Sequence, residues 1–271
     1  MPVITLLTDF GTVDEYVGVM KGVILSICPS ATVIDITHGI PPQDRVWAAY
    51  LLESGYRYFP PGTIHLAVVD PGVGTDRAIL AAEVGDYIVV APDNGVLTRL
   101  LTDNDLGRVV SVTNPEFVRP RISRTFHGRD NFAPVAAHLA RGADLEQLGP
   151  EIAPRRGGVV RLDLSVPELR PDGELVGTVV GSDRFGNLMT DIDEETLSTW
   201  GGAGQPVLMI GDHRVTGLAT SYADVPPGEP LMIVNSREYL EIAINGGSAE
   251  SGLGLRRGEP VRLVRSRINE Q

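Results

Sequence analysis

The stretch IHLAVVDPGVGTDR, residues 64–77, decides how the amino-terminal part of this chain folds. Residues 64–69 form an apolar, β-branched run, which predicts a buried strand. The strand ends at Asp70, because Pro71 has no N–H for the ladder and the glycines that follow favour a tight turn. Asp70 either caps this turn or faces a ligand, since open α/β sheets bind ligands at the carboxyl ends of their strands. Arg77 favours the second interpretation, because it sets a fixed positive charge beside the same loop.

Strands and helices alternate on both sides of this stretch, a pattern typical of a parallel α/β sheet with right-handed crossovers. Asp14 and Asp44 are placed to cap the first two helices, and Gly85-Asp86 is placed to turn a hairpin. We expect strands at residues 3–7, 32–37, 64–69, 77–84, 87–91 and 108–113, and further helices that end near residues 101 and 141.

The pattern changes after about residue 151, where helical periodicity nearly vanishes. Short β-rich runs separated by Gly, Pro, Asp and Asn predict a small antiparallel sheet or barrel. The runs are residues 175–180, 188–190, 207–210, 213–216, 231–234, 240–244 and 260–264. We therefore predict two domains: a mostly parallel α/β sandwich over residues 1–165 and a smaller antiparallel β-barrel over residues 166–271.

Composition narrows the class of protein. A chain of 271 residues with 42% hydrophobic and 21% charged residues is typical of a globular protein with a full core. A net charge of −12 argues against nucleic-acid binding, which needs basic patches. The single Cys28 excludes an internal disulfide and a cysteine zinc site. No stretch predicts a signal peptide or a membrane span, so we expect a cytoplasmic protein.

Polar residues gather at three predicted strand ends: Thr8-Asp9, Asp70 with Arg77, and His127. Because the carboxyl ends of parallel strands share one edge of a sheet, these residues have the potential to converge. An isolated histidine is more often structural, but beside Asp70 and Arg77 it is a plausible acid–base partner.

Two turns of the second half also carry unusual polar residues. Asp183, Phe185 and Asn187 lie in one turn, where they can pair an ammonium, stack on a flat ring and hydrogen-bond a base edge. The alternative is a hairpin turn that merely favours Asp and Asn. Ser236 beside Arg237 is a combination that binds carboxylates.

Motifs for several other classes are missing from the sequence. The glycines at 72 and 74 lack the third glycine of a dinucleotide fingerprint, and there is no Walker lysine. No histidine or aspartate cluster has metal-ligand spacing, and no nucleophile elbow occurs. We therefore expect neither a cofactor nor a metal.

Six motifs together resemble one family, the S-adenosyl-L-methionine (SAM) hydroxide adenosyltransferases, relatives of the SAM-dependent fluorinase and chlorinase. They are TDFG at 8–11, VVDPGVGT at 68–75, APDNG at 91–95, FHGRD at 126–130, GSDRFGN at 181–187 and NSRE at 235–238. The resemblance runs from residue 3 to about residue 265 and so covers both predicted domains. It implies a homotrimer whose active sites lie between the first domain of one subunit and the second domain of its neighbour.

The resemblance also implies the reaction: SAM is hydrolysed to adenosine and methionine by attack of water or hydroxide at ribose C5′. The catalytic residues of the family match Asp70, Arg77 and His127, and its ribose-binding aspartate matches Asp9. Residues matched to adenine and the methionine amine are Asp183, Phe185 and Asn187, and those matched to the methionine carboxylate are Ser236 and Arg237.

The main alternatives are a halogenase and a non-catalytic SAM or adenosine-binding module. The halogenases carry tyrosine in place of Asp70, serine in place of Gly128, threonine in place of Val73, and an insertion after the loop; this chain lacks all four. A binding module need not keep Asp70, Arg77 and His127 together.

The chemistry of water attack accounts for these residues. The sulfonium leaves as a neutral thioether, so only the nucleophile needs help. Asp70 can accept the proton of water, and Arg77 with a protonated His127 would favour hydroxide. Whether Asp70 or His127 is the base stays open at this level. A ribose clamped by Asp9 would fix the line of attack.

Overall fold

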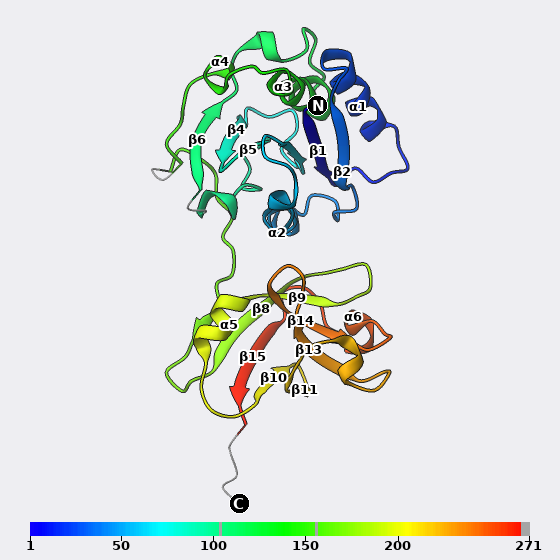
Figure 1. Cartoon of the computed structure of the whole chain (residues 1–271), viewed down its shortest axis with the longest axis vertical. Coiled ribbons are helices and arrows are strands. Elements are labelled where there is room, and N and C mark those ends of the chain that lie inside the picture. Colours follow the sequence, from blue (N-terminus) through cyan, green and yellow to red (C-terminus); the bar gives the residue numbers. More distant parts are fainter. Residues whose placement is uncertain (103–104, 155–156, 267–271) are drawn as a thin grey trace, which may run out of the picture. The chain divides into compact units, whose positions relative to one another are not determined.

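Figure 1 shows the protein as a computed structural model, which describes residues 1–102, 105–154 and 157–266. The chain divides into two compact units, Met1–Asp163 and Leu164–Gln271, two residues before the predicted boundary. Each unit has its own sheet and its own hydrophobic core. The predicted fold class, an α/β unit followed by a β-barrel-like unit, is confirmed.

The sheet of the first unit has the strand order β2-β1-β3-β5-β4-β6. Strands β2, β1, β3 and β5 pair in parallel, and β4 pairs antiparallel with both β5 and β6. The β4–β5 hairpin turns at Gly85-Asp86 as predicted. The strands are β1 Val3–Thr8, β2 Thr32–Thr37, β3 Ile64–Val68, β4 Ile79–Val84, β5 Tyr87–Pro92 and β6 Leu106–Ser111.

Helices cover both faces of this sheet (Figure 1). Helices α1 and α3 pack with Ile4 and Leu6 of β1 in the larger core, and α2 lies on the opposite face. On that opposite face, the hydroxyl of Thr5 on β1 is hydrogen-bonded to Nδ1 of His65 on the neighbouring strand β3. The helices are α1 Tyr16–Ile27, α2 Arg45–Gly55, α3 Ala133–Ala140 and α4 Leu145–Leu148, with 3-10 turns at Tyr56–Tyr58, Leu100–Thr102 and Pro115–Phe117.

Three helix predictions for this unit meet different outcomes. Asp44 caps α2 as predicted, since its carboxylate accepts a hydrogen bond from Trp47 N at 2.9 Å. Asp14 does not cap α1, which begins at Tyr16 after Glu15. The prediction of a helix that ends near Leu101 is wrong, because this stretch consists of turns followed by one 3-10 turn.

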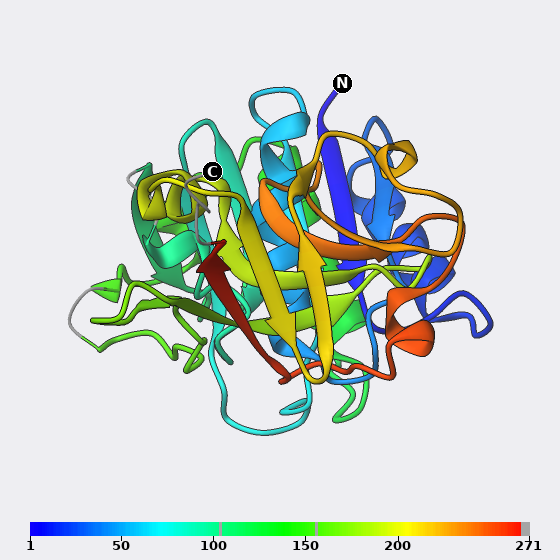
Figure 2. The ribbon, with the colours of Figure 1, turned by 90° about the horizontal axis from the view of Figure 1, so that it is seen from below.

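The second unit is a sheet of β-strands with the order β11-β10-β15-β8-β9-β14-β13-β12, with β7 paired to β8. All pairs are antiparallel except β12–β13, which is parallel. Figure 2 shows β15 beside its partner β10. The strands are β7 Glu168–Leu169, β8 Leu175–Ser182, β9 Leu188–Asp193, β10 Pro206–Ile210, β11 His213–Thr216, β12 Leu218–Ala219, β13 Pro230–Val234, β14 Tyr239–Ile244 and β15 Pro260–Arg265.

Two helices of this unit, α5 Glu194–Trp200 and α6 Ala249–Gly252, were not expected. Their start signals are nevertheless present in the sequence. Asp193 accepts a hydrogen bond from Thr196 N at 2.7 Å, and Ser248 accepts one from Ser251 N at 3.2 Å. Both are ordinary amino-terminal caps. The helices themselves were not predicted because they are too short to show a helical period.

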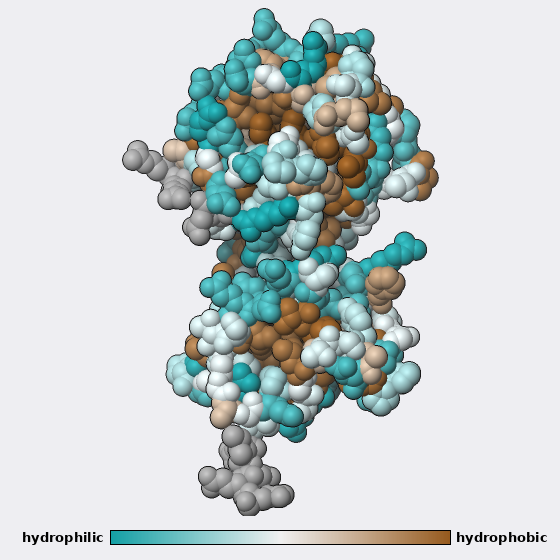
Figure 3. Space-filling model, viewed as in Figure 1, coloured by the Kyte–Doolittle hydropathy of each residue, from teal (hydrophilic) through white to brown (hydrophobic). Residues whose placement is uncertain are grey.

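The face of the molecule in Figure 3 is largely hydrophilic, and hydrophobic residues show through hollows over each sheet. Across the described ranges, no helix has the length and apolar character needed to cross a membrane.

Candidate active site

Asp70 lies two residues beyond Val68, the last residue of β3, at the carboxyl end of the strand. The loop turns sharply, with Val73 N donating to the Asp70 carbonyl at 3.2 Å. Gly74 has φ +84°, and a Cβ there would lie 2.5 Å from the carbonyl oxygen of Arg124. Only glycine fits this conformation and this approach. The loop therefore returns the chain so that Arg77 lies against Asp70.

Arg77 and Asp70 form a buried ion pair, with side chains 8% and 4% exposed. Nε of Arg77 donates to both carboxylate oxygens at 2.8 Å, and an Nη also bonds to Oδ2. The guanidinium lies 5.0 Å from the centre of the Phe132 ring. Charge-assisted, multiply bonded pairs of this kind hold both side chains in one orientation.

His127 joins this pair through Arg77, whose Nη2 donates to Nδ1 of His127 at 2.9 Å. A guanidinium has only donors, so Nδ1 accepts and the ring proton lies on Nε2. Burial, and then the positive charge of Arg77, lower the pKa of His127. Both the contact with Arg77 and the lowered pKa favour the neutral ring over the protonated His127 that the sequence analysis considered.

A π-helical turn, Gly128–Phe132, follows His127 and leads into α3. Such turns often occur at functional sites. A Cβ on Gly128 would lie 3.1 Å from Met20 Sδ and 3.2 Å from the rings of Phe10 and Phe126. The fully buried Asp130 anchors the turn, because its carboxylate accepts from Ser123 N at 2.8 Å.

Asp9 follows β1, the strand beside β3, so its carboxylate reaches the same edge of the sheet. One of its oxygens accepts a hydrogen bond from Gln43 N at 2.7 Å. Gln43 has φ +67°, an uncommon conformation for a residue with a side chain. Burial, with a smaller contribution from the charge of Asp70, raises the pKa of Asp9.

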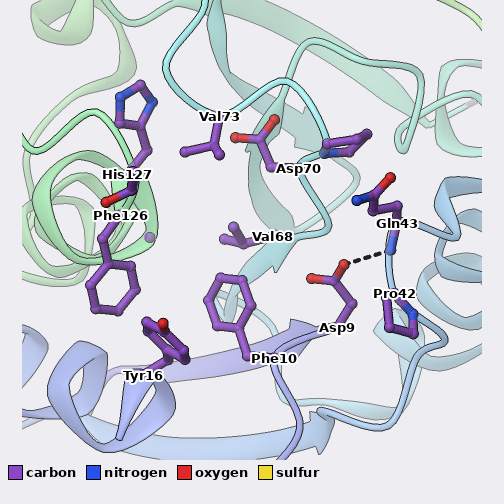
Figure 4. A pocket seen from close by; sticks show the side chains of 13 residues that line it. Asp9, Phe10, Tyr16, Pro42, Gln43, Val68, Asp70, Val73, Phe126 and His127 are labelled. Atoms are coloured by element: carbon purple, nitrogen blue, oxygen red, sulfur yellow. Dashed lines mark hydrogen bonds between the residues drawn. The ribbon is translucent and has the colours of Figure 1, made fainter. Parts of the chain in front are cut away.

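Asp9, Asp70 and His127 line one pocket of about 370 Å³ (Figure 4). The three strand-end candidates of the sequence analysis thus lie at one pocket, whose lining also includes the polar residues Gln43 and Thr125. An aromatic wall of Phe10, Tyr16 and Phe126 faces them, with ring centres 5.0 to 6.1 Å apart. The sequence motifs contain Phe10 and Phe126, but the apolar wall itself was not predicted.

The second unit holds a separate pocket of about 920 Å³. All five residues predicted for this unit line it, namely Asp183, Phe185, Asn187, Ser236 and Arg237. Oδ1 of Asp183 accepts from the backbone N of Phe185 and of Asn187, each at 2.9 Å. Its Oδ2 accepts from Asn187 Nδ2 at 3.1 Å, which orients the amide. Asp183 therefore fixes the shape of this turn, in which Phe185 is 74% exposed.

Tyr222 and Glu241 line the same pocket and were missed. No local signal marks them, because Glu241 alternates with apolar residues within a strand. Among the residues that the structure describes, no three His, Cys, Asp or Glu side chains group closely enough to hold a metal ion.

Known proteins resemble this chain over both of its units. The protein-family model described as SAM hydroxide adenosyltransferase N-terminal domain matches residues 4–149, and the family model of the corresponding C-terminal domain matches residues 177–262. The chain is 41% identical to a Thermus thermophilus protein named (R)-S-adenosyl-L-methionine hydrolase, over 95% of this chain and 98% of that protein. It is 31% identical to a fluorinase of Actinopolyspora mzabensis, over 98% of each.

A solved structure supports the likeness over the whole chain. The crystal structure of an uncharacterized conserved protein from Thermotoga maritima aligns with a TM-score of 0.89 at 36% identity, covering 97% of this chain and 100% of that one. A Salinispora arenicola (R)-S-adenosyl-L-methionine hydrolase is 38% identical over 97% of this chain and 98% of its own length. The resemblance read from the motifs is thereby confirmed, and this chain belongs to the SAM hydroxide adenosyltransferase family.

Proposed function

We propose that this protein hydrolyses SAM to adenosine and L-methionine. The observation that carries the proposal is that Asp70 and His127 line one pocket with Asp9, while Arg77 hydrogen-bonds to both Asp70 and His127. Relatives 38 to 41% identical over nearly the full chain are named (R)-S-adenosyl-L-methionine hydrolase, which supports the same reaction. No cofactor is needed, because the substrate and water supply every atom of the products.

In the proposed step, the oxygen of water bonds to ribose C5′ while the C5′–S bond breaks. The electron pair of that bond goes to sulfur, and methionine leaves as a neutral thioether. The proton of water goes to Asp70, whose carboxylate keeps a lone pair beside its bonds to Arg77. His127 is less suited to be the base, because Nδ1 is occupied by Arg77 and Nε2 carries the proton. Its Nε2–H is instead a donor that can orient the attacking oxygen.

The other residues of the first pocket position the substrate. Asp9 accepts hydrogen bonds from the ribose hydroxyls, and its bond from Gln43 N fixes the carboxylate before the sugar binds. The aromatic wall of Phe10, Tyr16 and Phe126 keeps bulk water away from the reacting carbon. Positioning of this kind lowers the barrier without new covalent chemistry.

The second pocket serves the two ends of SAM. Phe185 and Asn187 take the adenine, while Asp183 takes the methionine amine with its remaining lone pair. Ser236 and Arg237 take the methionine carboxylate. We propose that each complete site joins the first unit of one subunit to the second unit of its neighbour in a cytoplasmic homotrimer.

Mixing two inactive variants tests the shared site. Asp70→Ala subunits and Arg237→Ala subunits, denatured and refolded together, should regain part of the wild-type activity, because some sites then receive both intact halves. If each site lies within one chain, no mixture has an intact site and activity stays absent. Light scattering on the wild type gives the number of subunits in the same samples.

Product analysis in ¹⁸O-labelled water tests the reaction. The protein is incubated with each sulfonium epimer of SAM separately, with and without excess chloride or fluoride. Adenosine with ¹⁸O at the 5′ position and insensitivity to halide are expected. Halogenated nucleoside would assign the chain to halogenase chemistry, and bound but unreacted SAM would identify a binding module.

A further inference from the structure

Glu241 is a buried carboxylate that the proposed reaction does not use. It lies on β14, is 4% exposed and lines the second pocket. Buried carboxylates are costly to desolvate and persist only where hydrogen bonds compensate them. The groups that compensate Glu241 therefore indicate its role.

Two side chains from different segments donate to this carboxylate. Tyr222 donates its hydroxyl proton to Oε1 at 2.7 Å, and Asn235 donates from Nδ2 to Oε2 at 3.0 Å. Both donors line the same pocket as Glu241. Burial, and then the bond to Glu241, raise the pKa of Tyr222 to about 12, so its hydroxyl stays a donor at neutral pH.

Asn235 connects Glu241 to the loop that carries Ser236 and Arg237, because it hydrogen-bonds to both. Its Oδ1 accepts from the backbone N of Arg237 at 2.9 Å and of Tyr239 at 3.2 Å. Within the same loop Glu238 has φ +65°, a left-handed conformation that is unfavourable for a residue with a side chain. The loop needs such side-chain bonds to keep this shape, and the orientation of the Asn235 amide is set by Glu241.

We propose that Glu241 is the positioning residue for the amino-acid end of the site. It fixes the Tyr222 ring, and through Asn235 it fixes the 235–239 loop that receives the methionine carboxylate. This inference rests on the proposed function, because it takes SAM as the ligand. It adds a specificity element: the preference for SAM over an analogue that lacks the carboxylate depends on Glu241.

The tests are Glu241→Gln and Tyr222→Phe, with Glu168→Gln as control. Glutamine keeps the size of Glu241 but removes the negative charge that strengthens both bonds, and its NH₂ either reverses the bond with Tyr222 or loses the bond with Asn235. Phenylalanine at 222 removes only the hydroxyl. Glu168 is an exposed carboxylate on β7 of the same unit, outside the pocket.

Each test variant should raise KM for SAM about tenfold or more and change kcat less than about threefold, since a ground-state contact is weakened. Calorimetry should show weaker binding of SAM and methionine, while Kd values for adenosine and for decarboxylated SAM stay within about twofold. The double variant should lose less than the product of the single losses, because both act through one network. The control should match the wild type.

A merely structural role would lower affinity for adenosine and decarboxylated SAM to the same extent as for SAM, and that result overturns the proposal. An unchanged KM and Kd for SAM in Glu241→Gln overturns it as well. The wild-type assay separates the two proposals: wild type that binds SAM without hydrolysing it refutes the proposed reaction, while the ligand affinities still decide the role of Glu241.

Discussion

Nη2 of Arg77 donates to Nδ1 of His127 at 2.9 Å while the same guanidinium holds the carboxylate of Asp70. One planar cation thus orients both groups that face the pocket. It keeps Asp70 in place, and it holds His127 in the tautomer with its proton on Nε2. A lysine has a single point of charge and cannot bond to both in this geometry.

Arg77→Lys should lower kcat about a hundredfold with KM for SAM within about threefold, because it disturbs groups that act on the nucleophile. Steady-state kinetics on SAM measures both constants, and thermal unfolding shows whether the fold is kept. Arg121→Lys, at an exposed arginine of the same unit, is the matched control. A variant with near wild-type kcat would show that the fork geometry of Arg77 is not needed.

Asp70→Ala should abolish turnover, with kcat reduced at least about a thousandfold, because it removes the proposed acceptor of the water proton. SAM binding by calorimetry should change little. The exposed Asp76 of the same loop gives the control variant Asp76→Ala. Retention of most of the rate by Asp70→Ala would refute the proposed base.

Asp9→Ala should weaken SAM and adenosine binding about tenfold, because it removes a contact made before the reaction as well as during it. It should also lower kcat, since a loosely held ribose misaligns C5′. Calorimetry with adenosine isolates the binding effect. Adenosine affinity equal to wild type would exclude Asp9 from the ribose contact.

Gly128→Ser should destabilise the protein by about 1 to 3 kcal/mol, because the added atoms crowd Met20, Phe10 and Phe126. It should not produce halogenated adenosine, even though the halogenases carry serine at this position. Chemical denaturation and product analysis in chloride check both points. The control is Gly22→Ser on α1, where a Cβ would meet no atom within 4 Å. Normal stability with halide-dependent turnover would contradict this packing argument.

The stability of the protein should fall in mild acid because of His65. Burial lowers the pKa of His65 to about 4, and its ring is fully buried beside Thr5. Between pH 6.5 and 4 the unfolded chain therefore binds a proton that the folded chain excludes. The free energy of unfolding is highest above pH 6.5 and falls as pH is lowered, by about 3 kcal/mol at pH 4 from this residue.

Denaturant unfolding at several pH values checks this prediction, with His65→Gln as the comparison. Glutamine keeps a polar group for Thr5 but does not titrate, so the slope of stability against pH should become shallower. His127 and His138, whose pKa values are also lowered by burial, remain in both proteins and cancel. Equal slopes for the two proteins would show that His65 is not the acid-sensitive group.

Local features of the fold follow from the sequence because they depend on neighbouring residues. The strand before Asp70, the cap by Asp44 and the hairpin at Gly85-Asp86 each rest on a few adjacent side chains. The helix expected before Leu101 is absent, since the Asn94 side chain accepts from Val96 N at 3.2 Å and favours a turn. Short helices such as α5 escape notice because four to seven residues show no clear period.

The polar candidates that the sequence analysis named in the two pockets were predictable by type and position, since each stands in a turn with unusual polar residues. Their protonation states and their hydrogen-bond partners were not predictable. The neutral form of His127 depends on its burial and on Arg77, fifty residues away along the chain. Glu241 was missed because its partners Tyr222 and Asn235 come from other segments.

The sequence by itself determined most of the strands, the fold class, the family and the residue types at the strand ends, because turn chemistry and strand periodicity are local. Only the tertiary structure decided which groups hydrogen-bond, which tautomer His127 adopts and which carboxylates are buried. The physical reason is that desolvation and charge pairing depend on distances in space, and these arise only when segments far apart in the chain pack together.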